Sequence, residues 1–497
     1  MGWIGRALDR AIGEIAPAAG RERMAARQAM GLAMNYDAAS RGRRTEGWKA
    51  PATDGDAAAF GARERLRQLS RDMVRNRPYA ARAREVVVSN VVGTGIVPSV
   101  VHADAGVQEQ VWQVLSDHLL TPALDARGEL DLYALQEVVI GTVFTDGEIL
   151  ARRRIRRGKY ARELPLGFQV ELIECDHLDT TITSWGRNEV IEGVEYSPIG
   201  DIEAYHLFTE HPGSARMRGA LLRSERVSWR DVLHVRRLDR PGQLRGVPWL
   251  APVMLTMGDL SDYQEAEILK QKMASLLAGI VTYDKDDAAA SEVRKLRGLS
   301  KLEPGAVVAA PHGAQVSWTT PPRVEGYPDF LRENLGAIAM GIGITRESLT
   351  GDLSGVNFSS GRMGRMEMDR NVERWQRLVI LQFCQGIERW VQEAWRLQKV
   401  LPGEAFGLSH TAPRRALIDP NDEIDAMIKA VEGGVNSRQN VQRTLGLDPE
   451  RIRRERAEDE TKDAAAGLAA PALQAPPGAR DKRARQTTPA QTEEKPA

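Results

Sequence analysis

Residues 345–397 read TRESLTGDLSGVNFSSGRMGRMEMDRNVERWQRLVILQFCQGIERWVQEAWRL, and this stretch decides how the chain is organised. Residues 345–360 have the chemistry of a loop, because glycines alternate with Asp, Ser and Asn residues, which favour turns. Residues 361–400 have the period of a long amphipathic helix. The apolar residues that form one stripe along it are Val372, Trp375, Val379, Phe383, Ile387, Trp390 and Ala394.

The length of this predicted helix is informative. If it is unbroken from residue 359 to residue 397, it spans roughly 58 Å at about 1.5 Å per residue. Gly386 is the position where we expect a bend. A long helix with a polar loop at its head suits a subunit of a large assembly better than a small-molecule enzyme.

The composition limits the class of protein. The chain has 497 residues, which is enough for several domains, and its 68 basic and 68 acidic residues give a net charge of zero. A wholly basic protein that coats DNA is therefore excluded. The charges are nevertheless sorted along the chain: residues 1–90 and 150–160 are rich in Arg, and carboxylates collect at 258–267 and 419–425.

Two cysteines and the lack of long apolar stretches indicate the compartment. Cys175 and Cys384 stand outside any C-x-x-C pattern, so we expect buried free thiols in a reducing environment. No stretch approaches the roughly 18 apolar residues of a membrane span. Charged residues interrupt the amphipathic N-terminus where a signal peptide would be apolar. The sequence predicts a cytosolic product without a membrane anchor.

Outward from the opening stretch, periodicity predicts an α+β fold. The predicted helices are 57–92 with a break before Pro78, 107–120, 130–144, 254–281, 291–299, 327–340, 419–431 and 436–445. The predicted strands lie near Pro98 and at 149–155, 168–173, 190–196, 205–208, 227–235, 306–310 and 315–319, with weak strand character in 401–412. Residues 456–497 hold almost no large apolar side chains, which predicts a disordered tail.

Two basic segments each allow two interpretations. In the strand 149–155 and just beyond it, alternation places Arg152, Arg154 and Arg156 on one face, which is either a solvated or interface face or a DNA contact. The N-terminal arm, residues 1–50, is either an ordered surface arm or a contact to phosphate. The helix 57–92 carries an apolar stripe with its arginines on the other face.

The helix 254–281 is acidic in its first half. Its carboxylates are Asp259, Asp262, Glu265 and Glu267. The structural interpretation is that they favour the positive end of the helix dipole, and the functional interpretation is a charged inner surface.

No motif in the sequence carries catalytic or metal chemistry. There is no G-x-x-x-x-G-K-[ST] phosphate loop and no H-E-x-x-H, and the eight histidines are not paired at ligand spacing. Neighbours on a strand point to opposite sides, so Cys175, Asp176 and His177 make a poor catalytic set. The sequence therefore predicts no catalytic residue, no metal site and no cofactor, which argues against an enzyme.

Five segments, taken in order, carry a family resemblance. They are YDAASRGRRTEGW (36–48), LRQLSRDMVRNRPYAARAREVVVSNVVGTGI (66–96), DGEILARRR (146–154), QLRGVPWLAPV (243–253) and LTGDLSGVNFSSGR (349–362). Each is weak alone, but their order and spacing are specific. Over about residues 25–455 the chain resembles the portal proteins of tailed bacteriophages, in the lambda-type family.

The resemblance implies a division of the chain. It places an N-terminal arm at 1–50, a mixed α/β wing at 51–255, and a helical stem at 254–281 and 327–344. A small α/β clip follows at 282–326, a tunnel loop at 345–360 and a long wing helix at 361–400. A helical crown occupies 401–455, before the disordered tail at 456–497.

The resemblance also implies a function. Portal proteins form a homo-oligomeric ring, usually of twelve subunits, at one vertex of the virion capsid, and the ring assembles in the host cytoplasm. Double-stranded DNA enters through the channel during packaging and leaves through it on ejection. The terminase large subunit docks on the clip and head–tail joining proteins replace it later. The ring starts assembly of the major capsid protein or scaffold, without membrane involvement.

On this resemblance, the residues suggest how DNA slides. Strong phosphate binding would oppose sliding, so an acidic stem wall keeps the channel repulsive or neutral. Arg362 and Arg365 either grip phosphate or pair with acidic residues of the adjacent subunit, and we favour pairing. The loop residues expected to line the channel are Asp352, Ser354, Val356, Asn357, Ser359, Ser360 and Arg362. Two other functions stay open: a DNA-processing enzyme, and a minor capsid or scaffold protein.

Overall fold

The computed structural model describes residues 16–19, 22, 43, 46–47, 52–215, 223–275, 279–283, 314–318, 326–400, 405–413 and 419–467. The chain divides into two compact units, Met1–Ala58 and Ala59–Ala497. Helix α3 (Gly55–Ala59) begins in the first unit. The elements that follow belong to the second unit.

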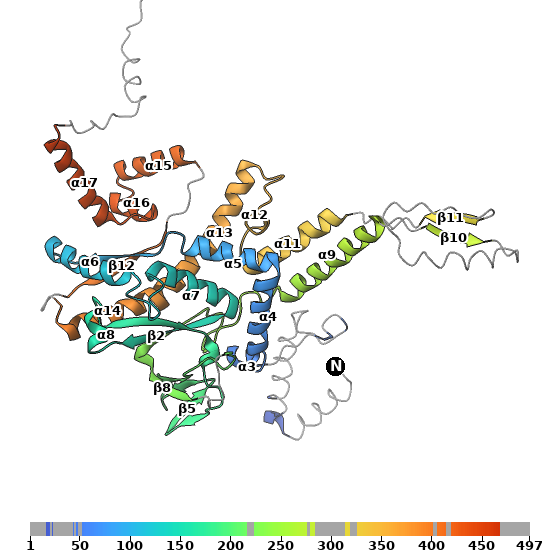
Figure 1. Ribbon diagram of the computed structural model, residues 1–497, viewed down its shortest axis with the longest axis horizontal. Helices are drawn as coiled ribbons and strands as arrows, with labels where there is room; N and C mark the ends of the chain where they lie inside the picture. Colours follow the sequence, from blue (N-terminus) through green and yellow to red (C-terminus); the bar gives the residue numbers. More distant parts are fainter. Residues whose placement is uncertain are drawn as a thin grey trace, which may run out of the picture. The chain divides into compact units, whose positions relative to one another are not determined.

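Four helices come early in the second unit (Figure 1). They are α4 (Arg63–Asn76), α5 (Pro78–Val91), α6 (Ala105–Leu119) and α7 (Leu132–Asp146). Pro78 begins α5, as predicted, because a helix tolerates proline where its missing N–H would be unpaired anyway. Asp104 and Asp131 cap α6 and α7 by accepting backbone hydrogen bonds.

Two antiparallel sheets follow. The first has the order β3–β2–β9, with β2 at Glu148–Ile155, β3 at Phe168–Ile173 and β9 at Val232–Arg236. The second runs in chain order through β4 (Ser184–Trp185), β5 (Asn188–Ile191), β6 (Val194–Tyr196), β7 (Ile202–Phe208) and β8 (Ser224–Ser228). A separate pair joins β1 (Val97–Val101) to β12 (Gly407–Thr411). Short helices α8 (Lys159–Arg162) and η2 (Cys175–His177) lie in the connections.

Two predicted strands are each two strands. The segment 190–196 contains a turn between β5 and β6, where Glu192 and Gly193 have φ values of 47° and 83°. The segment 227–235 leaves the second sheet at β8, passes through η3 (Trp229–Asp231) and enters the first sheet at β9. Both segments keep an apolar pattern across the turn, so periodicity alone could not separate the strands.

The long helix organises the core. It consists of α13 (Phe358–Val379), a π-helical turn η5 (Ile380–Cys384) and α14 (Gln385–Gln398). All seven residues of the predicted stripe are buried, with exposures of 9% or less. Trp249 packs between Phe144 and Trp375, with ring centroids 5.8 and 5.1 Å away. The predicted stripe is confirmed.

The irregularity of this helix lies at η5, and not at Gly386 as predicted. The side chain of Gln382, inside the π-helical turn, accepts from the Arg236 N–H (2.7 Å) and donates to the Arg236 carbonyl (3.0 Å). The π-helical turn therefore supplies hydrogen-bond partners to both backbone groups of Arg236, at the end of β9. Gly386 has another role: a Cβ there would lie 2.4 Å from the Leu233 side chain, so the helix packs directly on β9.

The predicted stem helix 254–281 is shorter than expected. Helix α9 covers Met254–Ser275, and residues Gly279–Tyr283 form β10 instead, paired antiparallel with β11 (Ala314–Trp318). The sequence GIVTY is rich in β-branched residues, which favour a strand over the last helical turn. The predicted helix 291–299 and strand 306–310 lie outside the described residues. Helix α11 (Tyr327–Ile342) packs beside α9 through Tyr263 and Phe330.

The C-terminal helices extend further than predicted. They are α15 (Pro420–Glu432), α16 (Arg438–Thr444) and α17 (Pro449–Ala465). Helix α17 overturns the prediction of a disordered tail for residues 456–465. Ion pairs three or four residues apart, such as Arg451–Glu455 and Lys462–Glu458, support a helix that buries little apolar surface. Residues 468–497 of the predicted tail lie outside the described residues.

Both cysteines are buried and free, as predicted. Among the described helices, none combines the length and the apolar character needed to cross a membrane.

Candidate nucleic-acid interface

The predicted loop 345–360 begins with a helix. Residues Arg346–Thr350 form α12, which Thr345 caps by accepting a hydrogen bond from the Ser348 N–H (3.1 Å). Gly351 ends α12 with a φ of 72°, a conformation that glycine adopts without strain. The loop proper is therefore residues 351–357, and α13 starts at Phe358.

Hydrogen bonds within the chain order this loop. The Asp352 carboxylate accepts from the Ser354 N–H (2.8 Å), and bonds from Ser354 lower the pKa of Asp352, with smaller effects from Arg346 and Arg332. Asn357 and Ser360 cap α13 reciprocally. Their polar groups are therefore engaged at the helix start. Ser354 and Ser359 are exposed, and Val356 is half-buried.

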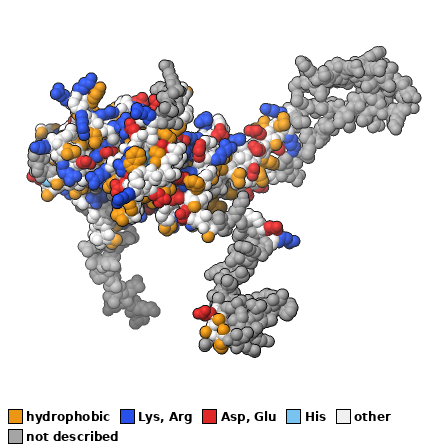
Figure 2. Space-filling model, turned by 90° about the horizontal axis from the view of Figure 1, so that it is seen from below, with side chains coloured by type: hydrophobic (Ala, Val, Ile, Leu, Met, Phe, Trp, Pro, Cys, Tyr) orange, Lys and Arg blue, Asp and Glu red, His pale blue; other side chains and the backbone are white. Residues whose placement is uncertain are grey.

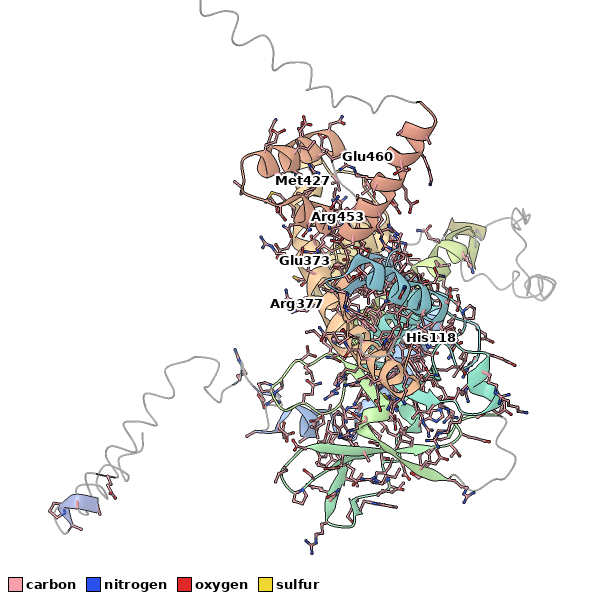
Figure 3. All side chains as sticks on the ribbon, turned by 90° about the vertical axis from the view of Figure 1, so that its left-hand side faces the viewer. His118, Glu373, Arg377, Met427, Arg453 and Glu460 are labelled. Carbon is pink, nitrogen blue, oxygen red and sulfur yellow. The ribbon has the colours of Figure 1, made fainter. Side chains whose placement is uncertain are left out.

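The structure separates the two arginines at the head of α13. Arg365 pairs with Asp369 one turn further along its own helix, with Nε and Oδ1 3.3 Å apart. Arg362 is exposed and forms no ion pair with any described residue. Of these two arginines, Arg362 is therefore the one without an ion pair to the described residues. Figure 3 shows Glu373 and Arg377 further along the exposed side of the same helix.

The four predicted stem carboxylates do not share one face. At about 100° per residue, Asp259, Asp262 and Glu265 span about 120° of the helix circumference. Glu267 lies about 80° from Asp259 in the other direction, so the four carboxylates span about 200°. Glu267 has a side chain only 13% exposed, and its carboxylate accepts from Gln271 (3.0 Å). Glu265 lies 3.6 Å from Arg77, the residue between α4 and α5. Asp259 and Asp262 are the exposed members of the set without such a partner.

The described part of the stem does not present a continuous acidic surface on the face seen in Figure 2. Acidic, basic and apolar side chains are interspersed there along α9 and α11. Helix α5 contacts both α9, which carries the predicted acidic residues, and α12, which precedes the loop. Tyr79 accepts a hydrogen bond from Gln264 of α9 (3.2 Å), and Arg82 donates to the Ser348 carbonyl of α12 (3.2 Å).

The basic strand is engaged within the chain. Arg152 pairs with Glu225 (3.1 Å), Arg154 with Glu171 (3.2 Å), and Arg156 donates to Gln169 (2.7 Å). These contacts favour the interpretation of a structural face over a DNA contact.

Sequence reasoning missed a buried ionic cluster centred on Glu148. This carboxylate is fully buried and accepts from Arg245 Nη2 (2.6 Å), His234 Nε2 (2.8 Å) and the Gly246 N–H (2.8 Å). Burial raises the pKa of Glu148, but Arg245 and His234 outweigh it and hold the pKa well below its usual range. Glu148 is therefore a buried anion with all its partners supplied by the fold.

The cluster continues along α4. Arg71 Nε donates to Asp146 (2.9 Å), while Arg67 pairs with Asp176 (3.2 Å) and Arg63 with Glu192. Arg63 and Arg67 are 3% and 6% exposed. Part of the predicted arginine face of this helix is therefore buried, because spacing of four residues aligns three cations opposite carboxylates at the end of α7, in η2 and in the turn between β5 and β6. Arg65, Arg75 and Arg82 remain exposed.

Two groups of side chains in this region have donor atoms close enough to hold a metal ion. The first group consists of Glu148, Cys175 and His234. Arg245 already donates to its carboxylate, and burial raises the pKa of the Cys175 thiol, which disfavours the thiolate that a metal would need. In Glu174, Asp176 and His211, Arg71 lies 3.4 and 2.7 Å from the two carboxylates. Both groups act as ion-pair partners.

The cluster brings together three of the segments that carry the resemblance. Residues 66–96 supply Arg67 and Arg71, residues 146–154 supply Asp146 and Glu148, and residues 243–253 supply Arg245. The only sign of the cluster in the sequence was that these short segments carry charges of opposite sign. The sequence does not show which arginine pairs with which carboxylate.

The described fold thus combines two antiparallel sheets, a helix pair that ends in a two-stranded sheet, and an ordered polar loop on a long helix. Residues 41–376 match the family model of the phage portal protein, lambda family, and the chain belongs to this family. The resemblance noted in the sequence is confirmed, and the family is structural.

Several known proteins are similar. The probable portal protein of Halomonas phage phiHAP-1 is 26% identical over 466 residues, which cover 87% of this chain and 88% of that protein. A chain from the neck of a native gene transfer agent particle, computed with C12 symmetry, is 14% identical (TM-score 0.42; 76% of this chain, 94% of that chain). An HK97-family phage portal protein from Corynebacterium diphtheriae is 10% identical (TM-score 0.32; 72% and 98%).

Proposed function

We propose that this chain is the subunit of a ring, with twelve copies expected, that forms a DNA channel at one capsid vertex. Double-stranded DNA passes through it during packaging and ejection. The observation that carries the proposal is the lambda-family portal match over residues 41–376, a range that includes α9, α11 and residues 351–357. The subunit itself performs no catalysis.

The proposal assigns partners to the ends of the molecule. The region between α9 and α11, where β10 pairs with β11, docks the terminase large subunit and later the head–tail joining proteins. The ring forms in the host cytoplasm, starts assembly of the major capsid protein or scaffold, and remains in the virion.

The described side chains support weak contact with DNA. Asp259 and Asp262 are exposed on α9, and the loop exposes Asp352 beside the uncharged Ser354. Each neutralised phosphate strengthens DNA binding, so a wall with exposed carboxylates lets the duplex slide. Glycines at 351 and 355 allow the loop its backbone path.

The mass and image of the purified full chain test the proposal. We expect a ring with a central hole in negative stain, and a mass of about twelve subunits. We also expect no hydrolysis of ATP or DNA. Hydrolysis would favour a DNA-processing enzyme, and a monomer or compact dimer would favour a minor capsid or scaffold protein.

Charge reversal on the stem tests the sliding mechanism. We expect the double variant Asp259→Lys with Asp262→Lys to package DNA less efficiently by on the order of tenfold, because added cations bind phosphate. Higher salt should restore part of the yield. Packaged DNA per assembled particle is the measurement.

The matched control carries the same charge change elsewhere. Glu189 is exposed on β5 and Asp201 just before β7, so Glu189→Lys with Asp201→Lys should package normally. Equal losses in the two double variants, or none in either, would contradict the mechanism.

A further inference from the structure

Helix α15 carries an apolar stripe that the described part of the chain covers only in part. Its members Ile424, Met427, Ile428 and Val431 recur at three and four residues, as in a helix that packs on a partner. No residue of α15 is buried, and Ile424 and Ile428 are 41% and 50% exposed. Val435, just beyond the helix, is 86% exposed.

The neighbouring helices have the opposite charge. Residues 419–432 hold five carboxylates and one lysine, whereas residues 436–456, which span α16 and the first half of α17, hold six arginines and three carboxylates. The second surface also has an apolar component that is only half-buried. Its members are Val441, Leu445, Leu447 and Ile452. Figure 3 labels Met427 on α15 and Arg453 on α17.

We propose that α15 of one copy packs on α16 and the first half of α17 of the next copy. The apolar stripe supplies burial, and the acidic and basic surfaces set the orientation. Because two different surfaces of the chain meet, the contact is heterologous, and its repetition closes a ring when the rotation fits. The inference rests on the proposed function in so far as a ring is needed to close the contact.

Directed cross-linking tests this contact in the full chain. The native cysteines are buried, so introduced surface cysteines are the accessible ones. Chains with Ile428→Cys and chains with Leu445→Cys are assembled together, oxidised and separated without reductant. We expect covalent dimers in the mixture and none from either variant alone. Absence of dimers in the mixture, or equal amounts from single variants, overturns the proposal.

A control pair and a second variant sharpen the test. Ile199 is 86% exposed in the β6–β7 connection, so Ile199→Cys mixed with Leu445→Cys should give no dimer. Ile428→Glu should lower the fraction of assembled rings by on the order of tenfold, whereas Ile199→Glu should not. Because Ile428 is exposed in the single chain, its substitution acts on assembly and not on folding.

Electron micrographs of the same samples separate the two proposals. Intact rings without cross-links overturn the contact at α15 and leave the portal function standing. Monomers without cross-links overturn both.

Discussion

Replacing Arg245 with methionine is expected to lower the free energy of unfolding by about 3–5 kcal/mol. Arg245 and Glu148 are 3% and 0% exposed, and their atoms approach to 2.6 Å. Methionine fills a similar volume but leaves the Glu148 carboxylate buried without its cation. Urea unfolding, followed by tryptophan fluorescence, is the measurement.

The control for this variant is an exposed pair. Arg370 and Glu367 lie 3.2 Å apart on α13, with side chains 75% and 74% exposed, so Arg370→Met should cost less than about 0.5 kcal/mol. Adding Glu148→Gln to Arg245→Met should recover at least about 1 kcal/mol, because the neutral amide no longer needs the cation. A loss below about 1 kcal/mol in Arg245→Met would show that the ion pair is not a major support.

Replacing Gly147 with alanine is expected to cost roughly 3 kcal/mol. Gly147 has a φ of 92°, which costs about 1–2 kcal/mol for a residue with a Cβ. The new Cβ would also lie 2.4 Å from the Val247 carbonyl carbon, and such overlap costs about 1–3 kcal/mol. The backbone of Val247 cannot move away from the new Cβ as the end of a flexible side chain could. The same unfolding measurement applies.

Gly128 separates the two contributions. Its φ is 73° and a Cβ there would meet nothing within 4 Å, so Gly128→Ala should show the backbone cost alone. We expect Gly147→Ala to be the more damaging variant by at least about 1 kcal/mol. Equal losses would mean that the contact between residues 147 and 247 relaxes freely.

Arg245→Met and Gly147→Ala both change the region that positions the loop and the carboxylates of α9. Arg71 ties α4 to the cluster through Asp146 and Asp176. Helix α5 follows α4 directly: Arg77, between the two helices, contacts α9, and Arg82 of α5 contacts α12. The buried cluster therefore positions the elements that carry the loop and the stem carboxylates, although it lies outside the sequence of either.

Local patterns in the sequence predicted the elements well where the pattern was long. The stripe from Val372 to Ala394 is buried throughout, and Pro78 begins α5. Element ends were less predictable. The sequence GIVTY at the end of the stem forms β10 because a partner strand, β11, pairs with it. Helix α12 forms within a segment whose glycines indicated a loop.

The candidate site residues stay predictions. The structure shows that Asp352, Ser354 and Arg362 are exposed. The acidic wall stays a prediction: its four carboxylates spread over about 200° of α9. Glu265 lies 3.6 Å from Arg77, and the Glu267 side chain is 13% exposed. The number of carboxylates along a helix does not predict where the neighbouring helix packs.

By itself, the sequence determined the long helix, its polar head and membership of the lambda portal family, because periodicity and ordered motifs are local or additive properties. Only the tertiary structure decided which charges are buried and which are free. Glu148 and Arg245 stand 97 residues apart, and Arg67 and Asp176 stand 109 apart. Any arginine can in principle pair with any carboxylate. Which pairs form is therefore decided by the packing that buries a particular arginine beside a particular carboxylate.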